Sequence, residues 1–236
     1  MAPRTVEATR IVTSEAPVRL ELDLPDLLVG WVCAAGVTVA DSPPELADQL
    51  EALLADTSQW GLNDEVRVGV RDLLRGHGYK PSGRGKPASE FLVRAASTDE
   101  FPRINNLVDI NNLMSLQTGW PISIIDRDLA RTDQFMMRHG AADESFVFNA
   151  AGHEIGLGGL LLLAADDGRP LGNPVKDSMA AKLTQDTTRV LVVIYTSRAV
   201  TDAATVGAVA AEFADLLRAH GGATAVASGV VEPAES

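Results

Sequence analysis

A run of amide side chains stands out among the residues that could do chemistry. Four asparagines and one aspartate fall within eight positions, Asn105, Asn106, Asp109, Asn111 and Asn112, and apolar residues lie between them. Polar side chains held among apolar ones usually end in partly buried places where they make hydrogen bonds. The run therefore predicts either a binding pocket or a helix start, in which Asp109 and Asn111 cap the helix and Asn105 and Asn106 hold a turn.

The segment that follows this run would turn the chain back along it. Apolar residues at helical spacing predict a helix over residues 110–117. A short apolar run over residues 122–125 predicts a strand, and Ser123 on that strand would face the helix that carries Asn111 and Asn112. These three polar side chains could then meet in one place.

Several familiar kinds of chemistry are not indicated by the sequence. It has no glycine-rich phosphate loop that ends in Lys-Ser or Lys-Thr, no His-Glu-x-x-His pattern and no pair of cysteines, so neither a metal site nor a cofactor is predicted. The histidines are scattered, and we assign none of them as a general base. They are His77, His139, His153 and His220.

The balance of charge limits the partners. A net charge of −12 argues against broad binding to nucleic acid, and we expect no DNA partner. One basic stretch, from Arg67 to Arg94, runs against this balance, since Asp72 and Glu90 are its only acids. It is either a solvated helix face with a flexible loop or a surface that contacts RNA phosphates. The residues proposed for phosphate contact are Arg71, Arg75, Lys80, Arg84 and Lys86.

The cysteine count and the apolar runs indicate the compartment. Cys33 is the only cysteine and lies in an apolar run, so we expect it to be buried in a protein of a reducing compartment. Residues 1–14 are polar and unlike a signal peptide. The longest apolar runs are far too short to span a bilayer. We therefore expect a cytoplasmic protein with no membrane partner.

The order of elements predicts an α+β fold, a mainly antiparallel sheet with packed helices, because several strands follow one another with few helices among them. Strands are predicted at residues 18–24, 28–39, 122–125, 134–138, 145–149, 160–165 and 190–195. Helices are predicted from Pro43, after Asn63, after Ala88, at 110–117 and at 202–220.

The chain is predicted to form a single domain over residues 1–236. A loop rich in Gly and Pro, residues 79–87, divides an N-terminal layer (1–78) from a core region (79–225). The residues after 225 are predicted to be a disordered tail, 226–236.

The run from Pro102 to Asp126 resembles the signature of the editing (B3/B4) domain of the phenylalanyl-tRNA synthetase β subunit, and free-standing relatives of that domain match better still. Tyr79-Lys80-Pro81-Ser82 is similar to the segment that precedes the signature. Lys182-Leu183-Thr184, with Thr187 and the strand after it, is similar to the segment that closes the domain. The resemblance covers roughly residues 75–222.

The resemblance implies a cytosolic, B3/B4-like domain that binds the aminoacylated 3′ end of tRNA and hydrolyses the ester when the amino acid is wrong. Chemistry of this kind uses no metal or cofactor and depends on placing a water and on electrostatics. The resemblance assigns Asn111, Asn112 and Ser123 to placing the ester and the water. Asn105, Asp109 and Gly172 are placed on the substrate side of the site, and Lys176 and Asp177, in a stretch that differs from the family, either join them there or form an ordinary polar loop.

The sequence also departs from the family pattern. Ser123 stands where synthetases often carry a histidine, and Val193 stands where bacterial synthetases place a glutamate. Residues 173–178 replace a stretch that contains tryptophan and arginine in free-standing relatives.

Three functions are therefore open. The first is hydrolysis of a mischarged aminoacyl-tRNA in trans, with aminoacyl-tRNA and an amino acid as partners. The second is transfer of the amino acid from tRNA to a small acceptor, which the departures would allow. The third is a non-catalytic module that binds an amino acid or a protein partner, which the acidity favours.

Overall fold

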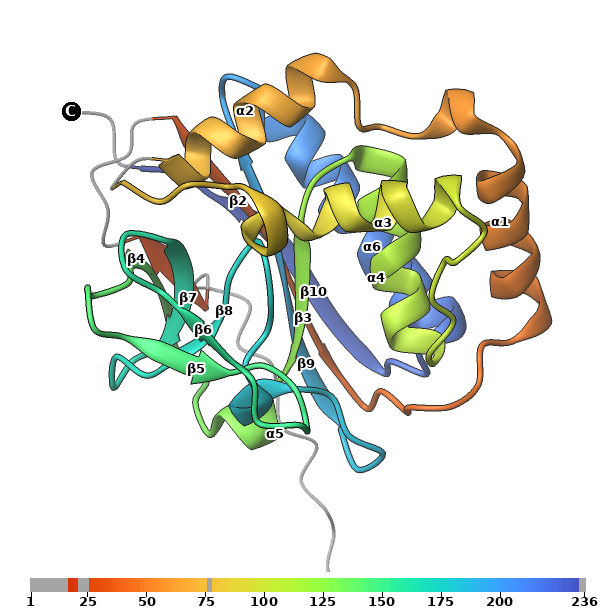
Figure 1. Cartoon of the computed structure of the whole chain (residues 1–236). Coiled ribbons are helices and arrows are strands. Elements are labelled where there is room, and N and C mark those ends of the chain that lie inside the picture. Colours follow the sequence, from red (N-terminus) through yellow and green to blue (C-terminus); the bar gives the residue numbers. More distant parts are fainter. Residues whose placement is uncertain (1–16, 21–25, 76–77, 234–236) are drawn as a thin grey trace, which may run out of the picture.

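The structure, a computed structural model, describes residues 17–20, 26–75 and 78–233. Two four-stranded sheets lie face to face, and helices cover the outer side of one of them (Figure 1). Most strand pairs are antiparallel, and one pair is parallel. The α+β class, with a mainly antiparallel sheet and packed helices, is confirmed.

The sheet beside the helices has the order β10-β2-β9-β3 and is antiparallel throughout. Its strands are β10 (Ala225–Val231), β2 (Leu27–Ala35), β9 (Arg189–Ser197) and β3 (Ile122–Asp126). Side chains alternate between the two faces of β9: Val192 packs against the helices, and Val193 packs between the two sheets. Apolar residues on both faces make the central strands continuous apolar runs in the sequence.

The second sheet has the order β1-β4-β7-β8, and a separate hairpin, β5 with β6, lies beside it. Its strands are β1 (Val18–Leu20), β4 (Phe135–His139), β7 (Leu161–Ala165) and β8 (Pro170–Gly172), and the hairpin is β5 (Ser145–Val147) with β6 (Glu154–Gly156). Most of the predicted strand over 18–24 lies outside the described residues. Cys33 is buried between the two sheets, as predicted.

One helix, α4 (Asn106–Thr118), lies at the centre of the helical layer. The others are α1 (Pro44–Ala55), α2 (Asp64–Arg75), α3 (Ala88–Ser97), α5 (Arg127–Ala130) and α6 (Ala203–His220), with single turns η1 (Thr57–Gln59), η2 (Gly83–Gly85) and η3 (Met179–Ala181). Helix α4 is buried on nearly every side because α1, α3, α6 and β3 all pack against it. None of the described helices is long and apolar enough to cross a membrane.

Helix α4 begins four residues earlier than predicted, because Asn105 is its N-cap. The Asn105 side chain accepts a hydrogen bond from the backbone N–H of Val108 at 3.0 Å. Asp109 supports the same helix start by accepting from the backbone N–H of Ile104 at 3.0 Å and from the Ser42 hydroxyl at 2.7 Å. The alternative in which Asp109 and Asn111 cap the helix is wrong.

Asn106 joins three separate segments of the chain. Its amide nitrogen donates to the backbone carbonyls of Thr38 and His220, both at 2.9 Å, and its carbonyl accepts from the backbone N–H of Ala40 at 3.0 Å. The residue is 4% exposed, so water cannot replace these bonds. Asn106 therefore fixes α4 against the segment before α1 and the end of α6.

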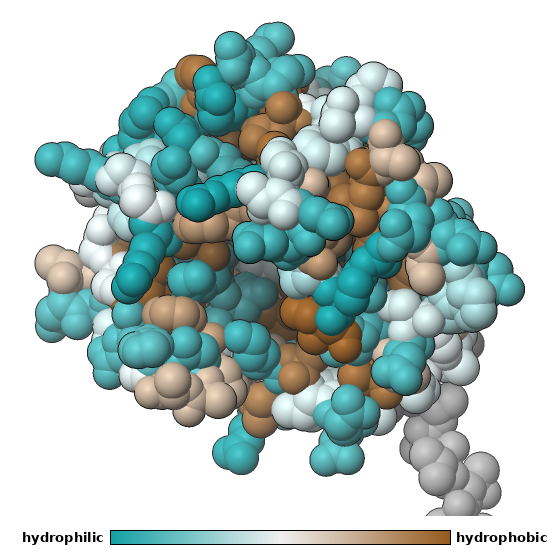
Figure 2. Space-filling view, turned by 45° about the vertical axis from the view of Figure 1, so that its right-hand side comes forward, coloured by the Kyte–Doolittle hydropathy of each residue, from teal (hydrophilic) through white to brown (hydrophobic). Residues whose placement is uncertain are grey.

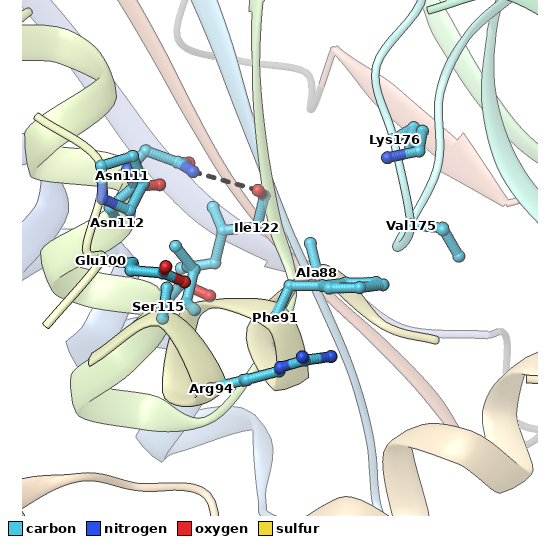
Figure 3. Close-up of a pocket in the computed structure, with 13 residues that line it drawn as sticks. Ala88, Phe91, Arg94, Glu100, Asn111, Asn112, Ser115, Ile122, Val175 and Lys176 are labelled. Carbon is cyan, nitrogen blue, oxygen red and sulfur yellow. Dashed lines mark hydrogen bonds between the residues drawn. The ribbon is translucent and has the colours of Figure 1, made fainter. Parts of the chain in front are cut away.

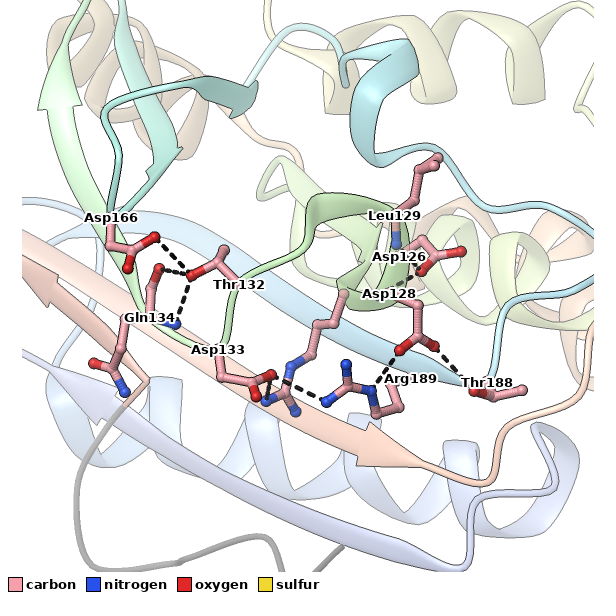
Figure 4. Close-up of polar contacts among 10 residues, drawn as sticks. Asp126, Asp128, Leu129, Thr132, Asp133, Gln134, Asp166, Thr188 and Arg189 are labelled. Atoms are coloured by element: carbon pink, nitrogen blue, oxygen red, sulfur yellow. Dashed lines mark hydrogen bonds and ion pairs between the residues drawn. The ribbon is translucent and has the colours of Figure 1, made fainter.

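A polar network ties the far end of β3 to β9 and to the segment just before it (Figure 4). Asp126 accepts from the backbone N–H groups of Asp128 and Leu129, which caps α5, and from the Thr187 hydroxyl at 2.6 Å. Arg189 on β9 binds Asp128 at 2.6 Å. The network closes the turn after β3, the strand that borders the site described below.

The predicted tail 226–236 is wrong over residues 226–231, which belong to β10. The strand pairs with β2 along its whole length, from Ala225 opposite Ala35 to Val231 opposite Val29. Its partner lies far away in the sequence, and residues of weak strand propensity such as Gly229 gave no local signal. Residues 234–236 lie outside the described part of the chain.

Replacing Asn106 with alanine should lower the free energy of unfolding by about 2–4 kcal/mol, because it leaves partly buried backbone groups of Thr38, Ala40 and His220 without their side-chain partner. Urea denaturation measures the loss. Asn63→Ala is the matched control: Asn63 caps the exposed start of α2 and should cost about 1 kcal/mol. Equal losses in the two variants would show that Asn106 does not hold the segments together.

Candidate functional site

A pocket of about 500 Å³ lies between α3, α4, the start of β3 and the loop 173–178. Its apolar lining includes Phe91 and Leu92 from α3, Ile122 from β3 and Val175 from the loop. Figure 2 shows a hollow near the middle of one face of the molecule, bordered by hydrophilic and hydrophobic side chains. Such a pocket is open enough to receive a small organic group and can fix its orientation with a few polar groups.

The polar wall of this pocket comes from α4, where Asn111 and Asn112 lie side by side (Figure 3). The amide nitrogen of Asn111 donates to the backbone carbonyl of Ile122 at 3.2 Å, and its carbonyl oxygen Oδ1 is buried without a hydrogen-bond partner. The Asn112 side chain makes no hydrogen bond within the described part of the chain. The Asn112 amide therefore retains polar groups that a bound molecule or a water can satisfy, whereas Oδ1 of Asn111 is shielded from solvent.

Charged side chains stand at the border of the pocket. Glu100 supplies a carboxylate, and Arg94 and Lys176 supply cations. Burial lowers the pKa of Lys176, and the nearby positive charges of Lys182 and Arg84 lower it further. The Lys176 ammonium lies 4.6 Å from the centre of the Phe148 ring, which offers it a favourable cation–π contact.

The loop that carries Lys176 is held at both ends. The Asn173 side chain accepts from the backbone N–H groups of Val175 and Lys176 at 2.8 and 2.9 Å, which forms a tight turn. The backbone carbonyl of Pro174 accepts from the N–H of Ala88 at 2.8 Å, at the first residue of α3. The loop and α3 therefore form one continuous wall of the pocket.

Ser123 does not face Asn111 and Asn112, so that expectation is wrong. Side chains alternate along β3: Ile122 and Ile124 point to the helix side, and Ser123 points to the side of the second sheet. There it lies 2% exposed and accepts a hydrogen bond from the Tyr195 hydroxyl at 3.1 Å. The three proposed catalytic side chains are divided between the two faces of β3.

Gly172 and Asp177 lie with Ser123 on that second face. Gly172 and Asp177 form an isolated bridge, and a side chain at position 172 would come within 2.6 Å of the Asp177 carboxyl and 3.5 Å of the Ser123 hydroxyl. Only glycine leaves room for this approach. The close contact brings the loop 173–178 against the edge of β3.

The Asp177 carboxyl is an unusual acid. Its Oδ1 atom is shielded from solvent and has no hydrogen-bond partner. Burial raises its pKa to about 7, and the opposing effects of the Ser123 hydroxyl and the charges of Lys182 and Lys176 are smaller. The same burial, together with Asp177, raises the pKa of Tyr195. The Asp177 carboxyl can therefore change its charge near neutral pH, within the loop that lines the pocket.

The five basic residues proposed for RNA phosphates fall into two sets. Arg71 makes a two-pronged ion pair with Glu90 at 2.6 and 2.5 Å, which joins α2 to α3, and Arg75 pairs with Asp72. Lys80, Arg84 and Lys86 lie in the loop before α3 and make no ion pair with any described residue. The second set is free to meet a polyanion, and the first already has partners.

The structure thus brings Asn111, Asn112 and Lys176 to one pocket, and it places Asn105 and Asp109 at the start of α4, where they support the helix. The contribution of α3 to the pocket was not predicted from the sequence. The helical spacing of Phe91, Leu92 and Ala95 gives α3 an apolar face, and that spacing could have indicated a surface turned toward a cavity. No local sequence pattern indicated that Glu100 would line the pocket.

The fold and the pocket define a class of α+β domain in which a buried helix presents asparagines to a cavity at a sheet edge. The sequence model of the B3/4 domain matches residues 82–210, more than half of the chain, and the chain belongs to this family.

Among solved structures, one similar to this chain is an N-terminal fragment of the phenylalanyl-tRNA synthetase β subunit from Pyrococcus horikoshii. It has 11% sequence identity and a TM-score of 0.44, and the match covers 92% of this chain and 51% of the other. This chain therefore spans about half the length of that fragment. Comparison with curated proteins gave no match.

The raised pKa of Asp177 predicts a pH-dependent stability. Between about pH 4 and pH 7 the folded protein keeps a proton that the unfolded chain has released, so the free energy of unfolding should fall as pH rises through this window and level off above it. Asp177→Asn should remove this contribution. Urea titrations at several pH values measure it, with Asp167→Asn, an exposed carboxyl, as the control. Parallel pH profiles of the wild type and the Asp177 variant would contradict the prediction.

Proposed function

We propose that this chain is a free-standing aminoacyl-tRNA editing domain that hydrolyses the ester of a mischarged aminoacyl-tRNA in trans. The observation that carries the proposal is the pair Asn111 and Asn112. They belong to the run Pro102–Asp126, which resembles the editing signature, and both residues line a pocket of suitable size. Membership of the B3/4 domain family supports it.

The chemistry suits a site without a strong base. Water attacks the carbonyl carbon of the ester, negative charge develops on the carbonyl oxygen, and the bond to the ribose oxygen breaks to give a free amino acid and a tRNA hydroxyl. Asn111 holds α4 against β3 through the backbone carbonyl of Ile122, and the Asn112 amide can donate to the developing oxyanion. The positive charge of Lys176 stabilises the same charge. Placement of the water and the ester supplies most of the remaining rate.

The rest of the pocket supports binding of an aminoacyl group. The Glu100 carboxylate lines the pocket and can bind the α-ammonium group, while Phe91, Leu92 and Val175 form an apolar surface for the side chain. On the other face of β3, Ser123 and Asp177 hold the loop that carries Lys176, so we assign them a positioning role in this function. The free cations Lys80, Arg84 and Lys86 are proposed to meet tRNA phosphates.

We further propose that residues 1–236 act as one functional unit. Strand β2, from the N-terminal layer, lies between β9 and β10 of the same sheet, and Asn106 binds backbone groups of both layers. The site thus depends on both parts.

The proposal is tested by incubating the protein with a panel of mischarged and correctly charged tRNAs and following release of the amino acid. Selective release from one mischarged tRNA is expected. No release from any member of the panel would refute hydrolysis. Appearance of the amino acid on an added small acceptor would instead identify a transferase. Stabilisation by a free amino acid without turnover would identify a binding module.

Replacing Asn112 with alanine should lower kcat/KM for release about 100-fold, because it removes a hydrogen bond made to the reacting group. The melting temperature should stay unchanged, because the Asn112 side chain makes no hydrogen bond within the described chain. Gln117→Ala is the matched control: this amide lies exposed on the same helix and contacts Glu212. Full activity in the Asn112 variant would place the reaction elsewhere.

A further inference from the structure

The loop 173–178 belongs to two environments at once. Val175 and Lys176 line the pocket and stand across it from the two asparagines of α4 (Figure 3). The next residue, Asp177, packs on the other face of β3, where it forms a bridge with Gly172 of β8. A shift of Asp177 is therefore passed to Lys176 through a single peptide bond.

The Asp177 carboxyl lies in a place suited to a neutral group. Its Oδ1 atom is shielded from solvent and has no hydrogen-bond partner. That atom lies so close to β8 that a side chain at position 172 would come within 2.6 Å of it. A carboxylate with no water or donor at one of its oxygens is unfavourable, whereas a protonated carboxyl has no charge to satisfy. The described position of the loop is therefore the one expected for the neutral acid.

Few charged groups face this carboxyl. On the side of β3 and β9 it meets hydroxyls: Tyr195 donates to Ser123 at 3.1 Å, and the Ser123 hydroxyl favours the ionised form of Asp177. Burial raises the pKa of Tyr195, which therefore stays neutral. Neither β8 nor η3 contains a charged side chain. The remaining charges are the ammonium groups of Lys182 and Lys176, and burial outweighs them, so the pKa of Asp177 is raised to about 7.

The two lysines differ in how they are held. The Lys182 ammonium donates to the backbone carbonyl of Phe148 at 2.9 Å. The Lys176 ammonium makes no hydrogen bond or ion pair with any described residue, and it lies 4.6 Å from the centre of the Phe148 ring. A cation–π contact of this kind is weak and easily exchanged for a carboxylate. Lys176 is thus the cation that can turn toward an ionised Asp177.

We propose that Asp177 is a pH-sensitive switch for the pocket: as a neutral acid it keeps the loop 173–178 against β3, and as a carboxylate it draws Lys176 out of the pocket. The inference rests on the proposed function, in which Lys176 stabilises the negative charge that develops on the ester. The ionised carboxyl must leave its shielded position to reach water or the ammonium group. Asp177 as a whole is not fully buried, so a small shift of the loop is enough.

The direction of the pH effect distinguishes this switch from general base catalysis. Below about pH 7 Asp177 keeps its proton and Lys176 stays in the pocket, and above it the carboxylate forms and Lys176 leaves. Release of the amino acid should therefore become slower as the pH rises. A site that works through a general base shows the opposite trend, because the base becomes reactive when it loses its proton.

Nuclear magnetic resonance of the isotope-labelled full chain tests the switch without any substrate. The carboxyl carbon of Asp177 should titrate near pH 7, and the backbone amide resonances of Val175 and Lys176 should follow with the same midpoint. Asp177→Asn should abolish the response of these amides, because its side chain cannot ionise. Asp167→Asn removes an exposed carboxyl and is the matched control, in which the response should be that of the wild type.

Lys176→Met tests whether this lysine is the partner of the ionised form. Without the ammonium group the carboxylate loses a favourable neighbour, so the midpoint of the Asp177 titration should rise. Arg218→Met is the control, because its guanidinium pairs with Asp215 on α6, and the midpoint should stay unchanged.

The pH profile of amino acid release gives a second readout. After subtraction of spontaneous ester hydrolysis, kcat/KM of the wild type should fall roughly tenfold between about pH 6.5 and pH 8, in proportion to the neutral fraction of Asp177. Asp177→Asn should stay active over the same range, since its side chain remains neutral.

The switch is overturned if the amides of Val175 and Lys176 do not respond between about pH 6 and pH 8, or respond alike in the wild type and in Asp177→Asn. An unchanged midpoint in Lys176→Met also overturns it. The wild-type titration decides the matter even where Asp177→Asn fails to fold. A loop that titrates in a protein that releases no amino acid would support the switch and refute the hydrolase, and release by a protein whose loop does not titrate would do the reverse.

Discussion

The position of α4 depends on side-chain amides that bind backbone groups of other segments. A helix packed on nearly all sides leaves no water to satisfy the chain ends around it, so the partners must come from the protein itself. Asn106 supplies them for the segment before α1 and the end of α6, and Asn111 supplies one for Ile122 on the edge strand β3. The pocket takes its shape from these bonds, because its polar wall is the next turn of the same helix.

The site also depends on β3 being an edge strand. Among the described residues no strand lies beyond it in its sheet, so the loop 173–178 can pass around its edge and contribute to both faces. On one face the loop presents Val175 and Lys176 to the pocket, and on the other Asp177 packs against Gly172 and Ser123. The Asp177 carboxyl on the buried face of β3 and the pocket wall on the other face therefore belong to the same loop. A change in the charge of this carboxyl acts on the pocket through that loop.

Much of this arrangement could be predicted from the sequence, where the signal was local. The apolar runs of β7 and β9, the period of α6 and the unusual density of asparagines in α4 all indicated what the structure contains. The start of α4 could not be predicted in this way, because a helix buried on all sides shows no amphipathic stripe to mark its limits. The direction of Ser123 depends on the register of β3 against β9, and the strand at Ala225–Val231 depends on a distant partner. The cavity between the segment before α3 and the hairpin of β5 and β6 is formed by two segments about 70 residues apart, so no local sequence pattern could show it.

The place of β2 in its sheet has a consequence for how the protein is made. This strand is synthesised near the beginning of the chain, yet both of its neighbours, β9 and β10, come from the last quarter. During translation this apolar strand therefore waits without partners until β9 has left the ribosome, and its other edge stays unpaired until Val231 has followed. Pairing across such long separations is slow and exposes the unpaired edges to other chains. A fold of the same size whose neighbouring strands are adjacent in sequence leaves such edges unpaired for a shorter time.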